Sequence, residues 1–245
     1  MQTSLHMRDW EEMANVDPLW AILSNPEKRF RNWNLDDFLR TGEVEISDLM
    51  ESANQIGLPK QRRTAIDFGC GVGRLTRALR NYFPECHGVD ISTNMLDMAR
   101  KLTPECDFRQ AGDLSSFSDG SADLVYSCMV LQHQPDHKHV AGLIADMVRV
   151  LAPGGLLVFQ LPLYLPWRNR LQLRRRGYRL LRALGLRHEF TYERLKLNPI
   201  RMLSLPQQDV ESIVASANGS VVRVDHTAKF SSPFVSGIYY CTTKS

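Results

Sequence analysis

Short apolar runs alternate with amphipathic stretches over the middle of the chain. The apolar runs predict strands at 64–68, 86–89, 107–110, 122–127 and 155–161. The amphipathic stretches between them predict helices at 73–82, 93–102 and 139–151, the last closed by Pro153-Gly154-Gly155 as a turn into the next strand. This alternation is typical of βαβ units that wind around a parallel sheet.

The C-terminal part adds one helix, at 206–217, and two strands, at 221–224 and 237–242. Too few residues separate these two strands for a right-handed helical crossover, so we expect the final strand to run antiparallel. The pattern therefore predicts an α/β fold: a doubly wound, seven-stranded, mostly parallel sheet with an antiparallel last strand.

The first sixty residues show helical periodicity instead, with Ile46, Leu49, Met50, Ala53 and Ile56 on one face before Gly57-Leu58-Pro59. We expect residues 1–60 to form a helical N-terminal cap. The remaining residues, 61–245, would form one large domain, in which 162–204 is an insertion between strands five and six.

That insertion is much longer than the connections usual in α/β units. Between positions 168 and 187 it contains eight arginines and no acidic residue, whereas the whole chain carries a net charge of +3. A basic amphipathic helix is expected around 169–184. It could be a lid whose arginines clamp an anionic acceptor, a helix on a membrane surface, a contact for nucleic acid, or a solvated face. Arginine without lysine favours the lid, because the guanidinium fork recognises anions by geometry.

Composition sets the class of protein. With 245 residues and 43% hydrophobic residues, the chain can bury a substantial core. No apolar run approaches the roughly 20 residues that span a bilayer, and the N-terminus lacks a signal-peptide pattern, so we expect a cytoplasmic protein. The five cysteines form no Cys-x-x-Cys pair, which favours buried thiols over a metal site or disulfides.

A glycine-rich loop follows the first predicted strand, with the sequence Asp67-Phe68-Gly69-Cys70-Gly71-Val72-Gly73. A strand, a glycine turn and a helix start place backbone N–H groups against a ligand. A dinucleotide fingerprint would need glycine at position 74, where Arg74 stands. The spacing instead resembles motif I of the class I, Rossmann-like S-adenosylmethionine-dependent methyltransferases.

Further landmarks of that family follow in order, so the resemblance covers roughly residues 60–160. Asp90 ends the second strand 21 residues after Gly69, where the family places a ribose-binding carboxylate. Asp113 and Leu114 end the third strand, where the adenine is bound, and Met129 follows the fourth. The alternative is that Asp67, Asp90 and Asp113 only cap helices. The resemblance implies that S-adenosyl-L-methionine is the cofactor and that it contacts Asp67, Gly69, Cys70, Gly71, Gly73, Asp90, Ile91, Met95, Asp113, Leu114 and Met129.

The segment after the fourth strand offers candidates for a catalytic base: His133, Asp136 and His137. His133 is the first choice, because it follows the strand directly and titrates near neutral pH. Alternatively, His133 only packs against the cofactor pocket. We expect His137 and His139 to be solvated at a helix start.

The acceptor is predicted partly by exclusion. The fourth strand lacks the Asn/Asp-Pro-Pro-aromatic motif of amino-group methyltransferases, and no Pro-Cys pair marks a cytosine enzyme. We therefore expect a methyltransferase that O-methylates a small hydroxylated metabolite, with anionic and lipid-linked metabolites included. The alternatives are an RNA methyltransferase, although nucleic acid is the less favoured partner, and a regulatory subunit that binds the cofactor without turnover. Oligomeric state stays open.

The N-terminal helices could supply the other wall of an acceptor pocket through their aromatic residues. Core packing is the simpler interpretation for each of these side chains alone. Arg29, Arg31 or Trp33 could also close over the methionine end of the cofactor. The aromatic candidates are Trp10, Trp20, Phe30, Trp33 and Phe38.

Overall fold

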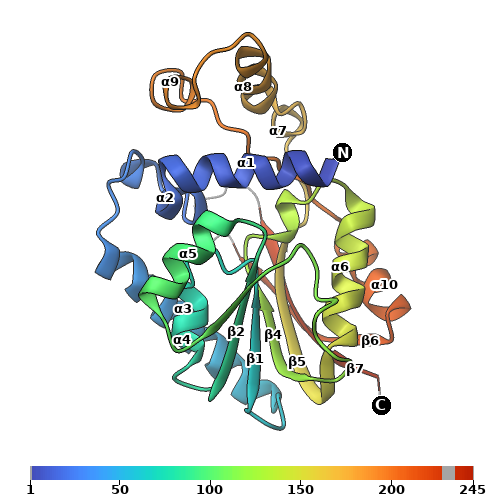
Figure 1. Cartoon of the computed structure of the whole chain (residues 1–245). Helices are drawn as coiled ribbons and strands as arrows, with labels where there is room; N and C mark the ends of the chain where they lie inside the picture. The colour runs from blue at the N-terminus through green and yellow to red at the C-terminus, as the bar shows by residue number, and fades with distance from the viewer. Residues whose placement is uncertain (1, 228–234, 245) are drawn as a thin grey trace.

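The computed structural model describes residues 2–227 and 235–244, and within that part of the chain seven strands form one sheet (Figure 1). The strands are β1 (Thr64–Phe68), β2 (Glu85–Asp90), β3 (Asp107–Gln110), β4 (Ala122–Ser127), β5 (Leu151–Pro162), β6 (Gly219–Thr227) and β7 (Ser236–Thr243). Their order across the sheet is β3-β2-β1-β4-β5-β7-β6. Strands β1 to β5 pair in parallel, and β7 runs antiparallel to β5 and β6. The predicted fold class, including the reversed last strand, is confirmed.

Helices precede, connect and follow these strands. Before the sheet come α1 (Gln2–Val16), α2 (Pro18–Ile22), the 3-10 turn η1 (Pro26–Lys28) and α3 (Leu35–Ile56). The parallel strands are connected by α4 (Arg74–Leu79), α5 (Thr93–Leu102), η2 (Leu131–His133) and α6 (His137–Arg149). Between β5 and β6 lie α7 (Trp167–Arg170), α8 (Leu173–Ala183), α9 (His188–Glu193) and α10 (Gln207–Ser216). In the described ranges, no helix combines the length and the apolar character needed to span a membrane.

Alternate residues of the central strands face opposite sides of the sheet, as strand geometry requires. Ile66 and Val125 lie in an apolar cluster with α6 and α10, whereas Ala65 and Leu124 lie in a second cluster with α3 and α4. Because both faces are covered, the strands read as continuous apolar runs in the sequence.

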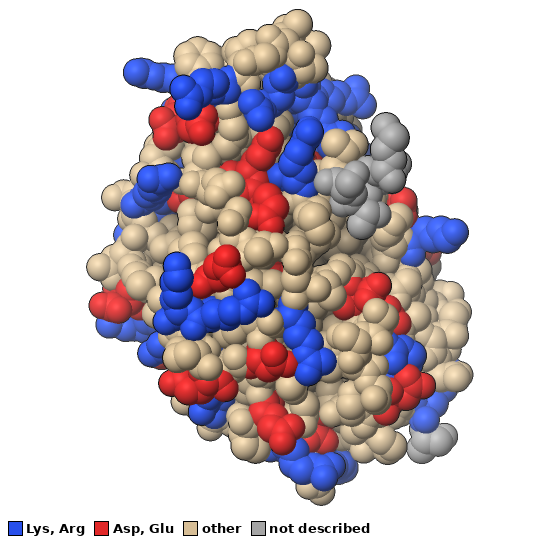
Figure 2. All heavy atoms as spheres, viewed as in Figure 1, with Lys and Arg blue, Asp and Glu red and all other residues tan. Residues whose placement is uncertain are grey.

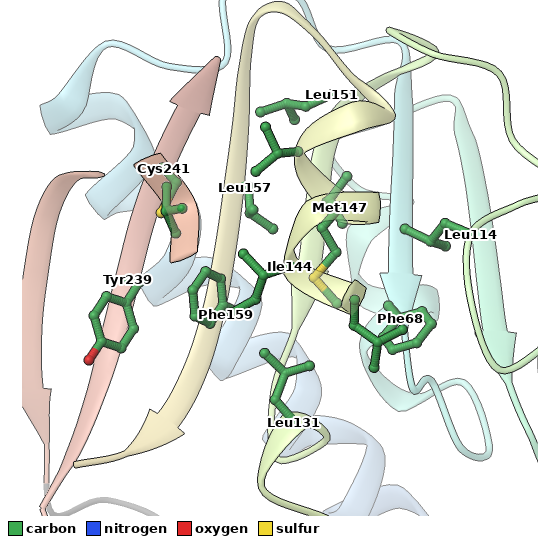
Figure 3. Packing of buried hydrophobic residues seen from close by; sticks show 14 of the residues in the cluster. Phe68, Leu114, Leu131, Ile144, Met147, Leu151, Leu157, Phe159, Tyr239 and Cys241 are labelled. Atoms are coloured by element: carbon green, nitrogen blue, oxygen red, sulfur yellow. The ribbon is translucent and has the colours of Figure 1, made fainter. Parts of the chain in front are cut away.

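The core beneath α6 extends to the antiparallel end of the sheet (Figure 3). Ile144 and Met147 of α6 share this cluster with Leu157 and Phe159 of β5. Phe159 in turn stacks on Tyr239 of β7, with ring centroids 5.1 Å apart. The last strand is therefore held by side-chain packing as well as by its hydrogen bonds.

Helix α1 crosses the end of the sheet, and α7, α8 and α9 lie on the far side of α1 from the sheet (Figure 1). Glu11 of α1 anchors this layer, because its carboxylate accepts from the Thr93 backbone N–H at 2.5 Å, at the start of α5. Helix α3 instead packs on the face of the sheet beside α4. Of the N-terminal helices, α1 and α2 therefore cover the end of the sheet.

Some element boundaries differ from the predicted ones. Strand β5 begins at Leu151, because Leu151 pairs with Ala122 before an irregularity in the β4–β5 register. Helix α6 begins at His137, since the Asp136 side chain caps it. The single basic helix predicted around 169–184 is divided into α7 and α8, because Gln172 has a left-handed φ of 48°, which a right-handed helix does not accommodate.

Candidate active site

A cavity lies beyond the carboxyl ends of β1 to β4 and beneath α1 and α2. It contains about 870 Å³ of empty space, including its open mouth, a size typical of small-molecule sites. The strand ends contribute the glycine loop and residues 89–91, 111–112 and 128–130. The order of strands reverses between β1 and β4, and ligands of open α/β sheets bind at such a reversal. The cavity is therefore the candidate active site.

The glycine loop forms the cavity wall nearest β1. Gly69 and Gly71 adopt positive φ angles of 79° and 53°. A Cβ atom on Gly69 would lie 2.1 Å from Val130 Cγ2, and one on Gly71 would lie 2.6 Å from Ile22 Cδ1. Neither position has room for a side chain, so the backbone itself faces the cavity and can approach a ligand closely.

Asp90 stands at the end of β2 and lines the cavity. Its carboxylate accepts from the Gly71 backbone N–H at 2.8 Å and from the Ser92 backbone N–H at 2.9 Å, through different oxygens. Burial raises the pKa of Asp90, while these two N–H groups lower it. Each carboxylate oxygen has two acceptor positions, so each keeps one for a pair of ligand hydroxyl groups.

Asp67 and Gly73, both predicted to contact the cofactor, are not among the residues that line the cavity. The buried Asp67 carboxyl accepts from Thr76 Oγ1 at 2.6 Å and so ties α4 to β1. Burial raises the pKa of Asp67 to about 7. Gly73 caps α4 with a φ of 80°, and a Cβ there would meet the Phe108 ring at 3.0 Å. Both residues shape the loop from behind.

After β3, the residues that line the cavity come one or two positions before the predicted ones. Ala111 and Gly112 line the cavity, whereas Asp113 and Leu114 do not. The exposed Asp113 accepts from the Ser115 backbone N–H at 3.0 Å, and hydrogen bonds from Ser115 lower its pKa. Leu114 is buried in the cluster beneath α6.

The other predicted contact residues Cys70, Ile91, Met95 and Met129 line the cavity and give it a largely apolar surface. Burial raises the pKa of the Cys70 thiol well above its usual value. The thiol is therefore protonated at neutral pH and is not poised to act as a nucleophile.

Met129 is held in an uncommon backbone conformation, with a φ of 58°. Its N–H donates to Gln160 Oε1 at 3.1 Å, and Gln160 Nε2 donates to Ser236 Oγ at 2.7 Å. Left-handed backbone at a residue other than glycine costs on the order of 1–3 kcal/mol and is concentrated at functional sites. The buried Gln160 thus fixes the cavity wall next to β4.

Two histidines and a tryptophan form the roof of the cavity: His6 and Trp10 from α1, and His133 from η2. The rings of Trp10 and His133 meet edge to face, with centroids 5.4 Å apart. The rings of His6 and Trp10 also meet edge to face, with centroids 6.5 Å apart. The predicted residue His133 is therefore at the cavity, and α1 brings a second histidine to it.

His133 is 9% exposed, and its Nδ1 lies 2.6 Å from the backbone carbonyl oxygen of Arg201. A carbonyl can only accept, so we assign the proton to Nδ1 and the lone pair to Nε2. Burial lowers the pKa of His133 to about 4, although the Arg201 carbonyl opposes this shift. His133 is therefore neutral at physiological pH.

The pKa of His6 is also lowered to about 4, first by burial and then by the nearby His133, Arg201 and Arg175. The two arginines keep their charge at neutral pH. Burial, reinforced by Arg179 and Arg201, lowers the pKa of Arg175 to about 10. The charged Arg175 and Arg201 therefore lie close to the neutral histidines of the cavity roof.

A second hollow lies next to the cavity. Consecutive residues line the two, because His133 and Gln134 line the cavity and Pro135 and His137 line the hollow. Asp136 also lines it, but arginines dominate. The arginines are Arg170, Arg175, Arg176 and Arg201. This hollow, which we call the arginine hollow, is suited to binding anions.

Arg74, the first residue of α4, also lines the cavity and places a cationic side chain beside the glycine loop. It is buried, and its Nη2 donates to Glu45 of α3 at 2.8 Å while its Nη1 donates to Thr41 at 3.2 Å. The other Glu45 oxygen accepts from Tyr126 Oη of β4 at 2.9 Å. The sheet, α3 and the glycine loop are joined at the cavity through this network.

Most of the N-terminal residues proposed for the site lie elsewhere. Trp10 lines the cavity. Arg29 donates to the Tyr192 carbonyl at 3.3 Å, and Arg31 donates to the Val16 carbonyl at 2.7 Å. The remaining aromatic residues are not among the cavity-lining residues: Trp20, Phe30, Trp33 and Phe38.

Sequence reasoning missed His6, Gln160 and Arg201. His6 had a usable signal, because it lies four positions before Trp10 on one face of a helix. Gln160 and Arg201 had none, since their roles depend on contacts with residues far away in the sequence.

Residues 66–159 match a family model described as a methyltransferase domain. This range runs from β1 into β5 and includes the glycine loop, Asp90 and His133. The chain therefore contains a region that matches a methyltransferase domain, and the sheet around it has the Rossmann-like α/β order.

Curated relatives carry a more particular name. Trans-aconitate 2-methyltransferase of Variovorax paradoxus (strain S110) is 34% identical over 135 residues, which is 54% of this chain and 50% of that protein. The enzyme of that name from Methylobacterium radiotolerans is 39% identical over 133 residues, again 54% of this chain and 50% of that protein. The chain thus spans about half the length of the curated relatives it matches.

Solved structures agree on the fold. Magnesium protoporphyrin IX methyltransferase from Synechocystis PCC 6803 with bound SAH aligns with a TM-score of 0.58 at 20% identity, covering 87% of this chain and 89% of that one. A SAM-dependent methyltransferase from Leishmania major aligns with a TM-score of 0.63 at 13% identity, covering 98% and 83%. Identities this low show the fold alone.

Proposed function

We propose that this chain methylates a carboxylate oxygen of a small organic acid, with S-adenosylmethionine as the methyl donor and a methyl ester as the product. The observation that carries the proposal is the cavity itself, which combines a glycine cradle and Asp90 with a roof of two neutral histidines beside the arginine hollow. The name of the curated relatives supports an acid acceptor and makes trans-aconitate the first acid to test.

The cavity residues fit the cofactor. Asp90 keeps one free acceptor position on each oxygen for the two ribose hydroxyls. Gly69 and Gly71 present bare backbone to the cavity, and Ile91 and Met95 offer apolar surface to the adenine ring. The bound cofactor supplies an electrophilic methyl group on a positively charged sulfur. The chain must then bind, align and desolvate the acceptor.

A carboxylate acceptor matches the protonation state of the roof. Its oxygen is already ionised at neutral pH, so the oxygen–carbon bond forms as the carbon–sulfur bond breaks and no proton has to be removed. His133, with a pKa near 4, would be a weak base for a hydroxyl group. We propose that His133 and Trp10 position the acceptor and exclude water, so a base role for His133 is not required.

The arginine hollow supports an acceptor with more than one carboxylate. Arg175 and Arg201 are partly desolvated. Asp9 lies 3.7 Å from Arg175 but is shared with Arg179, and among the described residues no acidic side chain forms an ion pair with Arg201. This leaves excess positive charge next to the cavity roof. Arginine binds carboxylates with two parallel hydrogen bonds, so one carboxylate of a di- or tricarboxylate would bind here while another meets the methyl group.

The test is an assay with methyl-labelled S-adenosylmethionine and a panel of acids that begins with trans-aconitate. Matched alcohols without a carboxylate complete the panel. We expect label in a product that mild base hydrolyses, as it does a methyl ester but not a methyl ether. Arg201→Gln should raise the KM for the acid, whereas Arg194→Gln, an exposed arginine outside the hollow, should not.

Two outcomes would contradict the proposal. A base-stable product from an alcohol would identify a hydroxyl acceptor. Cofactor binding without any acceptor-dependent product would favour a regulatory subunit. An RNA methyltransferase has less structural support, because Arg179 and Arg182 face Asp9 and Glu12 of α1, at 3.3 Å and 3.0 Å.

A further inference from the structure

Helix α8 exposes its apolar side chains. Leu173, Leu180 and Leu184 are 64%, 62% and 68% exposed. Their spacing of seven and four positions places them on one face of the helix. Such a stripe on a surface helix normally faces the core of the protein.

The opposite face of α8 is polar and points into the molecule. Tyr178 is buried, and its hydroxyl donates to Glu12 of α1. Arg182 donates to the other Glu12 oxygen at 3.0 Å, and Arg179 donates to Asp9 at 3.3 Å. The helix is thus inverted relative to an ordinary surface helix: Tyr178, Arg179 and Arg182 bond to α1. Leu173, Leu180 and Leu184 are exposed and belong to none of the apolar clusters of the described residues.

Two further exposed apolar side chains precede α8 in the chain. Trp167 of α7 is 68% exposed, and Leu171, between α7 and α8, is also exposed. We call the surface formed by Trp167, Leu171, Leu173, Leu180 and Leu184 the outer face. Figure 2 shows uncharged atoms at the upper end of the molecule, with Lys and Arg side chains below them and some Asp and Glu side chains among these. The exposed arginines of this segment are Arg168, Arg170, Arg174, Arg176 and Arg187.

We propose that the outer face docks on the surface of a membrane that contains anionic lipids. The leucines and Trp167 would enter the boundary between headgroups and acyl chains, while the exposed arginines contact lipid phosphates. The segment between positions 168 and 187 contributes eight arginines and no acidic residue, and Glu189 pairs with Arg187 at its end, so the rim has a net positive charge. A basic rim around an apolar stripe is complementary to such a lipid surface.

The same arrangement disfavours other occupants. A two-fold contact between two copies of the chain would place basic rim against basic rim, and like charges would repel. A nucleic acid would contact the arginines but would leave the exposed leucines of α8 without an apolar partner. Helix α1, which carries the roof residues His6 and Trp10, lies between α8 and the cavity. Docking through α8 would therefore place only the thickness of α8 between the lipid and the helix that covers the active site.

Vesicle co-sedimentation of the full chain tests the proposal. The vesicles are made of phosphatidylcholine alone or of phosphatidylcholine with phosphatidylglycerol. We expect binding to the anionic vesicles that is at least about tenfold stronger than to the neutral ones and that weakens with salt. Leu180→Gln/Leu184→Gln should weaken this binding about tenfold, and so should Arg168→Gln/Arg174→Gln, two exposed arginines outside the arginine hollow.

A matched variant controls for exposed apolar area. Leu35→Gln/Val44→Gln removes two exposed apolar side chains from α3, far from α8, and should bind vesicles like the wild type. Weakening of vesicle binding by Leu35→Gln/Val44→Gln that equals the weakening by Leu180→Gln/Leu184→Gln, or no binding to anionic vesicles, would overturn the proposal. It would also be overturned if light scattering showed a dimer that the α8 variant alone converts to a monomer, because the occupant would then be a second copy.

Discussion

The glycine loop and helix α8 place polar and apolar groups in opposite ways. At the loop, the apolar side chains of Val130 and Ile22 pack against Gly69 and Gly71, and the polar backbone of the loop faces the cavity. At α8, Tyr178 and Arg182 point inward and leucines point outward. The protein's own packing therefore determines the loop, whereas the outer face of α8 depends on something outside the described chain. Mutations should cost stability at the first region and change association at the second.

The largest effect is expected at the loop. Gly69→Ala would place a Cβ 2.1 Å from Val130 Cγ2, on a backbone with a φ of 79°. Overpacking and the unfavourable φ together should lower the free energy of unfolding by about 2–4 kcal/mol. Thermal and denaturant unfolding measure this loss.

The double variant Gly69→Ala/Val130→Ala separates the two causes. Removing the Val130 methyl groups relieves the overlap but not the backbone strain, so we expect partial recovery relative to Gly69→Ala. Stability equal to wild type in the single variant would contradict the packing argument.

The next largest effect is expected at His133 in the cavity roof, on the pH dependence of the free energy of unfolding. Because the folded pKa of His133 is about 4 and an unfolded histidine titrates near 6.5, the unfolded chain binds the extra proton between these values. The stability contributed by a neutral His133 is thus fully present above about pH 6.5 and is lost as the pH falls toward 4.

His133→Gln removes this term, so its stability should fall less steeply between pH 6.5 and 4, by up to roughly 3 kcal/mol. Only the difference between the two proteins is informative, because His6 adds to the slope and Asp67, with its pKa raised to about 7, opposes it in both. Parallel pH curves would show that His133 is not held neutral.

A smaller, local effect is expected where α1 meets α8. Burial raises the pKa of Glu12, but hydrogen bonds from Tyr178 and Arg182 outweigh it and hold the pKa below its usual value. Glu12→Gln should weaken this contact by about 1–2 kcal/mol. Trypsin should then cleave within 168–187 faster than in wild type, while the unfolding of the sheet changes little. Unchanged cleavage would mean that Glu12 does not hold the insertion.

The smallest effect on stability is expected on the outer face. Because Leu180 and Leu184 are exposed, Leu180→Gln/Leu184→Gln should change the free energy of unfolding by less than about 0.5 kcal/mol. A large loss measured by denaturant unfolding would show that these leucines pack within the protein, and the contrast with the glycine loop would disappear.

The periodic parts of the sequence predicted most of the fold. Both faces of the sheet are covered, so strands such as 122–127 appear as unbroken apolar runs and were placed at the bounds observed. The division between α7 and α8 escaped prediction, because it depends on the left-handed backbone of Gln172, which no periodicity marks.

The site was predictable where it depends on local motifs. The glycine loop and Asp90 are adjacent to strand ends, and their spacing together with the resemblance to a methyltransferase family identified them. Arg201 is brought to His133 across 68 positions of the chain, so its contribution required the fold. The role of Asp67 behind the loop likewise depends on Thr76, with which it pairs only after α4 packs on β1.

The most direct test of the central claim is calorimetric titration of the protein with S-adenosylmethionine and with NADH, for wild type and for Asp90→Ala. We predict that wild type binds S-adenosylmethionine and not NADH, and that Asp90→Ala weakens binding at least about tenfold with the fold intact by circular dichroism, because both ribose hydroxyls lose their acceptor. Equal binding of S-adenosylmethionine by the two proteins, or no binding by wild type, would contradict the assignment of this cavity as the cofactor site.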